Sequence, residues 1–138
     1  MTPETVFGVA NAAALSAWLA LVIFPGARTA RQFAGWLVPI GLAVAYSVLV
    51  ALFIGRGSGG FDSLAGVAQL FSNPWLLLAG WIHYLAFDLL VGVSEAADAT
   101  ERGVSRWLLT PCLILTFLFG PAGWLLYQLV RRTGAVVR

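Results

Sequence analysis

Four long runs of apolar residues, separated by polar or glycine-rich stretches, make up most of this 138-residue sequence. Each run is close to the ~20 residues that an α-helix needs to cross the ~30 Å hydrocarbon core of a bilayer. The pattern predicts an all-α integral membrane four-helix bundle, with residues 1–138 forming a single transmembrane domain. The predicted helices cover residues 5–24, 36–54, 75–93 and 108–130.

Residues at the ends of the runs support these boundaries. Pro25 and Gly26 stop the first run, and the second stops at the glycine-rich stretch GRGSGG. Asn73 and Pro74 suit the N-cap and the first position of the third helix. Glu4, and no arginine, precedes the first run, so we expect this run to remain in the mature protein and not to be a signal peptide.

Two connections carry signals of their own. Between the second and third helices, four apolar residues recur at near-helical spacing: Phe61, Leu64, Ala68 and Phe71. They are typical of a short helix on the membrane surface, and an ordinary loop fits equally well. Residues 94–106 alternate in charge and are interpreted as a solvated connection. Asp98 and Arg102 would pair there if the third helix continued past the membrane.

Small residues recur at every fourth position of the first two helices. They are Gly8, Ala12, Ser16 and Ala20 in the first helix, and Ala43, Ser47 and Ala51 in the second. Such stripes let helices approach closely in lipid, so we expect both stripes to be packing seams.

Composition agrees with a membrane protein, since 60% of the residues are hydrophobic and 10% are charged. A net charge of +2, carried by scattered arginines, gives no reason to expect a nucleic-acid partner. The expected partner is membrane lipid, with a homo-oligomer left open. The compact, arginine-only composition favours a bacterial inner membrane. Four crossings would place four arginines on each side, so the positive-inside rule gives no orientation.

The third run contains two groups that fit a bilayer poorly. His83, the single histidine, lies near its middle, and Asp88 lies about 7 Å nearer one surface. An ionised aspartate at the centre of a membrane helix costs on the order of 2.5–3.5 kcal/mol. We therefore expect both side chains to face the bundle interior, as candidate catalytic residues. On a straight helix they are about 140° apart, so they would line two sides of a long cavity or meet different helices.

Aromatic and polar residues surround these two groups. Trp81, Tyr84, Asp88 and Glu95 share one stripe of the third helix. Asn11 and Trp18 form a matching face on the first helix. The candidate ligand-contacting residues are Asn11, Trp18, Trp81, Tyr84, Phe87, Phe117 and Trp124. We expect no metal and no cofactor, because one histidine without a Cys/His cluster is a poor metal signature.

The fourth run is interrupted in the stretch FLFGPAGW. Pro121 has no amide hydrogen and leaves the Phe117 carbonyl without its helical donor, so we predict a kink here, flanked by Gly120 and Gly123. Freed backbone at this depth must face protein or an internal cavity. The imidazole N–H of His83 is a candidate donor to it.

Two interpretations of the polar pair remain open from the residues. In the structural one, His83 bonds the kinked helix and Asp88 bonds Asn11, a serine or an arginine. In the functional one, His83 and Asp88 are acid/base groups or ligand contacts in a mid-membrane pocket.

The segments FSNPWLLLAGWIHYLAFDLLVG and TPCLILTFLFGPAGWLLYQLV, with NAAALSAWLALVIFP in the first helix, resemble a known family. It is the abscisic-acid-deficient-four-like family of small membrane proteins, whose plant members act in neoxanthin synthesis. The W-I-H-x-x-x-x-D-L core and the F-G-P-x-G turn carry the resemblance.

The resemblance implies that the protein binds a carotenoid-like or other isoprenoid lipid and acts on it by an isomerase-type reaction. Converting violaxanthin to neoxanthin is redox-neutral: an epoxide opens and a proton leaves. That chemistry needs one acid and one base, with no metal or nicotinamide. His83 and Asp88 fit these roles in type. The alternative is a non-catalytic small membrane subunit or assembly factor.

Overall fold

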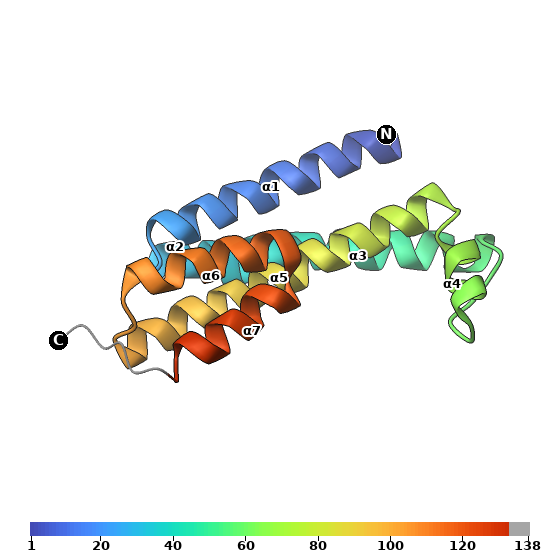
Figure 1. Ribbon diagram of the computed structural model, residues 1–138. Helices are drawn as coiled ribbons and strands as arrows, with labels where there is room; N and C mark the ends of the chain where they lie inside the picture. Colours follow the sequence, from blue (N-terminus) through green and yellow to red (C-terminus); the bar gives the residue numbers. More distant parts are fainter. Residues whose placement is uncertain (133–138) are drawn as a thin grey trace.

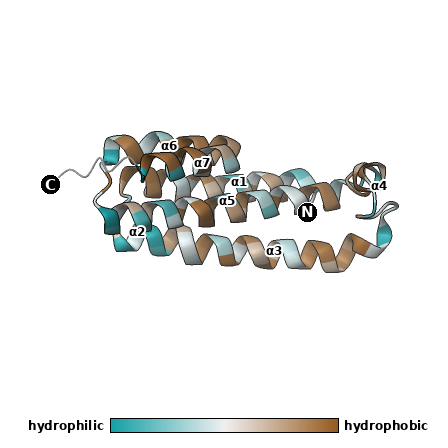
Figure 2. Ribbon diagram, turned by 60° about the horizontal axis from the view of Figure 1, so that its bottom comes forward, coloured by the Kyte–Doolittle hydropathy of each residue, from teal (hydrophilic) through white to brown (hydrophobic). Residues whose placement is uncertain are grey.

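A computed structural model describes residues 1–132, and every element of that part of the chain is a helix (Figure 1). Three helical stretches are long and apolar enough to cross a membrane: Pro3–Ile23, Arg28–Arg56 and Pro74–Arg102. Successive stretches run in opposite directions (Figure 1). Hydrophobic residues prevail along their length, and hydrophilic ones gather toward the ends (Figure 2). The predicted all-helical membrane architecture is therefore present, with three long helices.

The first helix, α1 (Pro3–Ile23), lies within two residues of its predicted bounds. Its N-cap is Thr2, whose side chain accepts a hydrogen bond from the Thr5 amide. The buried residues of α1 are Ala10, Ala14, Ala17, Trp18 and Leu21. Gly8, Ala12 and Ser16 are exposed, so the predicted packing seam is wrong. An alanine-rich helix offers several stripes of small residues, and the stripe beside Trp18 is the one that packs.

The second long helix begins at Arg28, eight residues before its predicted start. It consists of α2 (Arg28–Gln32), a π-helical turn η1 (Phe33–Leu37), α3 (Val38–Phe53) and a short 3₁₀ turn η2 (Ile54–Arg56). Pro39 cannot donate to the carbonyl of Gly35, and the π-helical turn, where the Val38 amide bonds the Phe33 carbonyl, carries the helix past this gap. The stripe of Ala43, Ser47 and Ala51 is exposed, so this predicted seam is also wrong.

The connection to the next long helix contains α4 (Leu64–Leu70), which confirms the short helix that the spacing suggested. Helix α5 (Pro74–Arg102) begins as predicted, with the Asn73 side chain accepting a hydrogen bond from the Trp75 amide. It ends at Gly103, whose φ of +68° is left-handed.

The end of α5 lies nine residues beyond its predicted position, so most of the predicted solvated connection is helical. Its inner face stays apolar there, because Ala96 and Ala99 are buried against the bundle. Asp98 and Arg102 form the i,i+4 ion pair, with Oδ1 and Nε 2.8 Å apart.

The fourth predicted helix is two helices, α6 (Arg106–Phe119) and α7 (Pro121–Val130). The chain reverses at Gly120, whose φ is +44°, and α7 runs back beside α6 (Figure 1). Gly123 lies so close to Thr116 that a Cβ atom would overlap its backbone nitrogen and hydroxyl. In a continuous helix these residues would be about 10 Å apart. The predicted kink at Pro121 is therefore a reversal, and the predicted four-helix bundle is three long helices with a helical hairpin.

The hairpin changes which residues share an end of the molecule. With 14 and 10 residues, α6 and α7 are each too short to cross the hydrocarbon core. The hairpin brings the chain back to the end where α6 begins, opposite the N-terminus (Figure 1). Six of the seven arginines of the described chain lie there: Arg28, Arg31, Arg102, Arg106, Arg131 and Arg132. We call this the arginine-rich end, and Arg56 lies at the other end. Arg138 lies outside the described residues, and the predicted four-against-four division is wrong on whichever side it is placed.

Candidate functional site

Helix α5 lies at the centre of the bundle and packs against α1, α3, α6 and α7. Its polar side chains divide between two sides of the helix. Tyr84, Asp88, Glu95 and Asp98 lie toward the α6–α7 hairpin, whereas His83 lies toward α3. The two sides therefore form separate sites.

On the hairpin side, Tyr84 satisfies the backbone at the reversal. Its hydroxyl donates to the carbonyls of Phe117 and Leu118, each at 3.3 Å. These carbonyls belong to the last turn of α6, where helical donors run out. The sequence correctly indicated that the Phe117 carbonyl would need a donor, but His83 is not that donor.

Two further contacts join α5 to the hairpin. The Thr116 hydroxyl donates to Oε1 and Oε2 of Glu95 at 3.0 and 3.1 Å, and both residues are buried. Nearer the arginine-rich end, Asp98 accepts a 2.6 Å hydrogen bond from the Tyr127 hydroxyl and pairs with Arg131 at 3.4 Å. These contacts, together with the hydrogen bonds of Tyr84, fix the hairpin along α5.

Asp88 lies against the point of reversal. A Cβ atom on Gly120 would lie 2.6 Å from the Asp88 Oδ1 atom. Gly120 is the N-cap of α7, so the carboxylate lies at the positive end of that helix dipole. Its Oδ2 atom is buried without a hydrogen-bond partner in residues 1–132. The predicted bond to Asn11, a serine or an arginine is not formed within that range.

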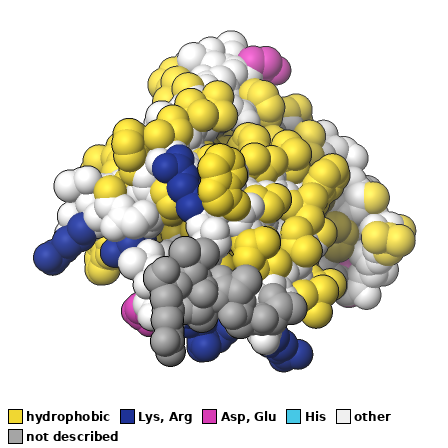
Figure 3. Space-filling model, turned by 60° about the vertical axis from the view of Figure 1, so that its left-hand side comes forward, with side chains coloured by type: hydrophobic (Ala, Val, Ile, Leu, Met, Phe, Trp, Pro, Cys, Tyr) yellow, Lys and Arg dark blue, Asp and Glu magenta, His cyan; other side chains and the backbone are white. Residues whose placement is uncertain are grey.

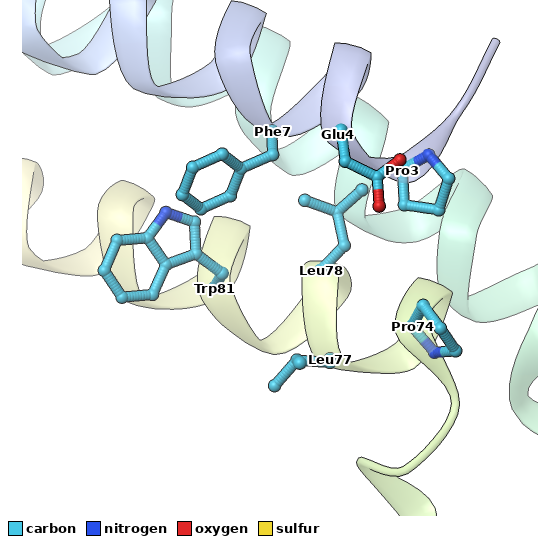
Figure 4. Close-up of a pocket in the computed structure, with 7 residues that line it drawn as sticks. All are labelled: Pro3, Glu4, Phe7, Pro74, Leu77, Leu78 and Trp81. Carbon is cyan, nitrogen blue, oxygen red and sulfur yellow. The ribbon is translucent and has the colours of Figure 1, made fainter.

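The α1 side of α5 brings together two predicted ligand-contacting residues. The Trp81 indole N–H donates to Asn11 Oδ1 at 3.2 Å, and the Trp81 ring lies 5.2 Å from that of Tyr84 and 5.7 Å from that of Phe7. Trp81 and Phe7 end a groove of about 350 Å³ between α1 and α5 (Figure 4). Glu4 is the acidic residue of this mainly apolar groove.

Two other predicted ligand-contacting residues, Trp18 and Trp124, do not line this groove. Trp18 is buried, with its ring 5.6 Å from that of Phe117, and it fills the space left by Gly92 on α5. Trp124 is 46% exposed on α7. Trp18 therefore belongs to the core, and Trp124 lies on the outer surface.

His83 does not face the bundle interior, which corrects the prediction for this residue. Its side chain is exposed, with its ring 4.5 Å from the exposed ring of Phe87 and 5.5 Å from the ring of Tyr46 on α3. No hydrogen bond joins it to another side chain of the described part. Its separation from Asp88 around α5 is as expected, and the two groups meet different helices.

His83 and Tyr46 line a cavity of about 470 Å³ between α3, α4 and α5. We call it the His83 cavity. Its other lining residues are apolar: Val50, Ile54, Phe61, Leu70, Phe71, Leu76, Ala79 and Gly80. Tyr46 was not predicted as a site residue. Its signal in the sequence is a phenol, next to Ser47, within a mainly apolar second run.

Within the described range, no three residues among His, Cys, Asp and Glu are close enough to hold a metal ion together.

Long apolar helices with exposed apolar surfaces define a small membrane protein with several membrane-crossing segments. The sequence model of the ABA DEFICIENT 4-like family matches residues 5–127, and the chain belongs to that family. The resemblance inferred from the W-I-H-x-x-x-x-D-L and F-G-P-x-G motifs is thus confirmed.

One curated relative is the iron(3+)-hydroxamate import system permease protein FhuB of Salmonella typhimurium (strain LT2). It is 32% identical over 109 residues, which cover 78% of this chain. The matched region is 14% of the permease, so the chain corresponds to a small part of it. No solved structure matches this chain.

Proposed function

We propose that this membrane protein binds a carotenoid-like or other isoprenoid lipid in the His83 cavity, and that His83 and Tyr46 act on it by redox-neutral acid/base chemistry. The observation that carries the proposal is the position of His83. It is exposed on the surface of an apolar helix, lines a cavity, and has no hydrogen-bond partner in the described chain.

An unpartnered imidazole in hydrocarbon is unfavourable, and ionisable residues in membrane segments usually face protein or a cavity. A ligand that places an oxygen atom beside His83 would supply the missing hydrogen bond. Epoxide, hydroxyl and carbonyl groups of oxygenated isoprenoids all accept a hydrogen bond from an imidazole N–H.

The cavity walls suit the rest of such a ligand. Val50 from α3, Ile54 from η2 and Leu76 from α5 offer apolar contact in the cavity. Phe61 and Phe71, which flank α4, also line it. A long unsaturated chain would lie along these residues, with its oxygenated ring at His83 and Tyr46.

The two polar groups of the cavity match the reaction that an epoxide isomerisation requires. One group donates a proton to the epoxide oxygen as the C–O bond breaks. The other removes a proton from carbon, and its electron pair forms the new double bond. A neutral phenol can donate a proton but is a poor base, so we assign the acid role to Tyr46 and the base role to the imidazole of His83.

Asp88 takes a different role in this proposal. It lies on the hairpin side of α5, against Gly120, and does not line the His83 cavity. We therefore assign Asp88 to positioning the hairpin, together with Tyr84.

The test is expression in a bacterial host that makes oxygenated carotenoids, followed by purification and chromatography of bound and total pigment. We expect a copurified polyene and a changed pigment profile with the wild-type protein. His83→Gln should remain folded and lower conversion at least about tenfold, the usual scale for loss of a general acid or base being 10²–10⁴. Tyr46→Phe should also lower it.

Ser47→Ala, an exposed change beside Tyr46, is the matched control and should leave conversion unchanged. A colourless, lipid-free wild-type protein, or full conversion by His83→Gln, would contradict the proposal.

The second candidate is a non-catalytic membrane subunit. Tyr84, Glu95 and Asp98 each form a hydrogen bond to the hairpin, so packing alone explains why these polar residues are present. This favours the second candidate. The partial match to a permease points the same way. This function predicts no bound polyene and a normal pigment profile in every variant.

A further inference from the structure

We propose that the arginine-rich end binds the headgroup of an anionic phospholipid, in a cavity between α1, α5 and α6. This proposal is independent of the isoprenoid site, which lies between α3, α4 and α5. The cavity has a volume of about 400 Å³, and its walls come from the end of α1, the last turns of α5 and the start of α6.

Arg106 supplies the first positive charge, since it lines this cavity and is exposed. In the described chain, no carboxylate lies within ion-pair distance of its guanidinium. An arginine without a protein counter-ion, facing a cavity at the end of a membrane protein, is suited to a phosphate group.

Arg31 supplies the second positive charge, through hydrogen bonds to three residues that line the cavity. Its Nη1 atom donates to the carbonyls of Pro25 and Gly26, both at 3.1 Å, and to the Thr100 hydroxyl at 3.3 Å. Pro25, Gly26 and Thr100 all line the cavity. These bonds hold the guanidinium in place, and its other N–H groups have no partner among residues 1–132.

The nearby acids do not cancel these charges. Asp98 pairs with Arg102 and Arg131, and Glu95 is buried against Thr116. Glu101 is exposed and pairs with neither Arg31 nor Arg106. Basic side chains accordingly stand out around this end of the molecule, among extensive hydrophobic surface (Figure 3).

The apolar part of the cavity favours a phospholipid over a free phosphate ion. Leu109 forms a buried wall, and Ile23 and Phe24 are 46% and 60% exposed beside it. Acyl chains would lie against Ile23 and Phe24 while the phosphate contacts Arg31 and Arg106. Inner leaflets rich in anionic lipid attract such basic ends.

The test uses the full-length protein, purified in a mild detergent and titrated with phosphatidylglycerol, phosphatidylcholine or inorganic phosphate. Native mass spectrometry counts bound lipid, and the midpoint of thermal unfolding reports stabilisation. We expect phosphatidylglycerol to bind and raise the midpoint, and the other two to have little effect. Arg106→Gln should weaken phosphatidylglycerol binding roughly tenfold, as expected from loss of a charged hydrogen bond.

Arg56→Gln is the matched control, because it removes the same charge at the opposite end and should bind phosphatidylglycerol as the wild type does. Arg106→Lys keeps the charge without the bidentate geometry and should show intermediate binding. Equal binding by Arg106→Gln and the wild type would overturn the proposal. Equal stabilisation by inorganic phosphate would overturn the choice of a phospholipid.

Discussion

Glu95 and Thr116 are buried polar residues whose side chains satisfy each other across α5 and α6. A buried carboxyl group that loses its partner retains the full cost of leaving water. The Thr116 hydroxyl should therefore matter more to stability than an average threonine does.

Thr116→Val removes this hydroxyl with little change in shape. We expect it to lower the free energy of unfolding by about 1–3 kcal/mol, the usual cost of an unsatisfied buried polar group. Thermal or denaturant unfolding of the purified protein measures the change. Thr116→Ser keeps the hydroxyl and should lose much less. Equal losses in the two variants would indicate that the missing methyl group, and not the hydrogen bond, sets the stability.

At the residue scale, the sequence predicted which groups needed partners better than it predicted the partners. Of the predicted stripe, Tyr84, Asp88 and Glu95 face the hairpin. Trp81, its fourth member, bonds Asn11 on α1 instead. Helical periodicity gives angles within one helix, but it does not say which helix lies on each side. His83 was therefore placed inward, although its side of α5 opens to a cavity beside Tyr46.

At the scale of the elements, the same signal in F-G-P-x-G is compatible with a kink or with a reversal. Proline removes one helical hydrogen bond in either case, and glycine permits both. What distinguishes them is the contact of Gly123 with Thr116, a close approach that exists only after the chain has turned back. The sequence shows a glycine there, but not what it approaches.

Gly123→Ala should therefore prevent the hairpin from closing as observed. The added methyl group would overlap the Thr116 backbone, and overpacking of this kind costs about 1–3 kcal/mol or more. We expect a lower yield of folded protein and a lower thermal midpoint, both measured in detergent. Gly8→Ala is the matched control, since a Cβ atom at Gly8 meets no atom within 4 Å. A Gly123→Ala variant as stable as Gly8→Ala would argue against the hairpin.

The start of α5 was predicted to within one residue, whereas its end was predicted nine residues too early and the start of the second long helix eight residues too late. A cap such as Asn73 is local, so it can be predicted from a few residues. The end of α5 depends on tertiary contact, because Ala96 and Ala99 remain buried after the charged residues begin. The early start of the second long helix has a different cause: the π-helical turn accommodates Pro39 inside the helix.

At the scale of the whole molecule, the hairpin decides the number of crossings. Three crossings leave six of the seven described arginines at one end, with Arg56 at the other. Arginine-rich segments near the ends of membrane helices remain on the cytoplasmic side. The arginine positions therefore give no orientation for four crossing helices, but they give a clear orientation for three crossing helices followed by a hairpin.

We predict that the arginine-rich end faces the cytoplasm and that the α4 connection faces the opposite side. Single-cysteine variants test this orientation in a Cys112→Ala background, which removes the buried native thiol. Ser58→Cys lies in the α4 connection and Glu101→Cys at the arginine-rich end, and both positions are exposed. A membrane-impermeant maleimide should label Ser58→Cys in spheroplasts, and Glu101→Cys only after the membrane is permeabilised. Labelling of both after permeabilisation is the control for reactivity. Both three and four crossings place these two positions on opposite sides of the membrane, so the experiment tests the orientation. Labelling of Glu101→Cys, and not of Ser58→Cys, in intact spheroplasts would contradict the predicted orientation.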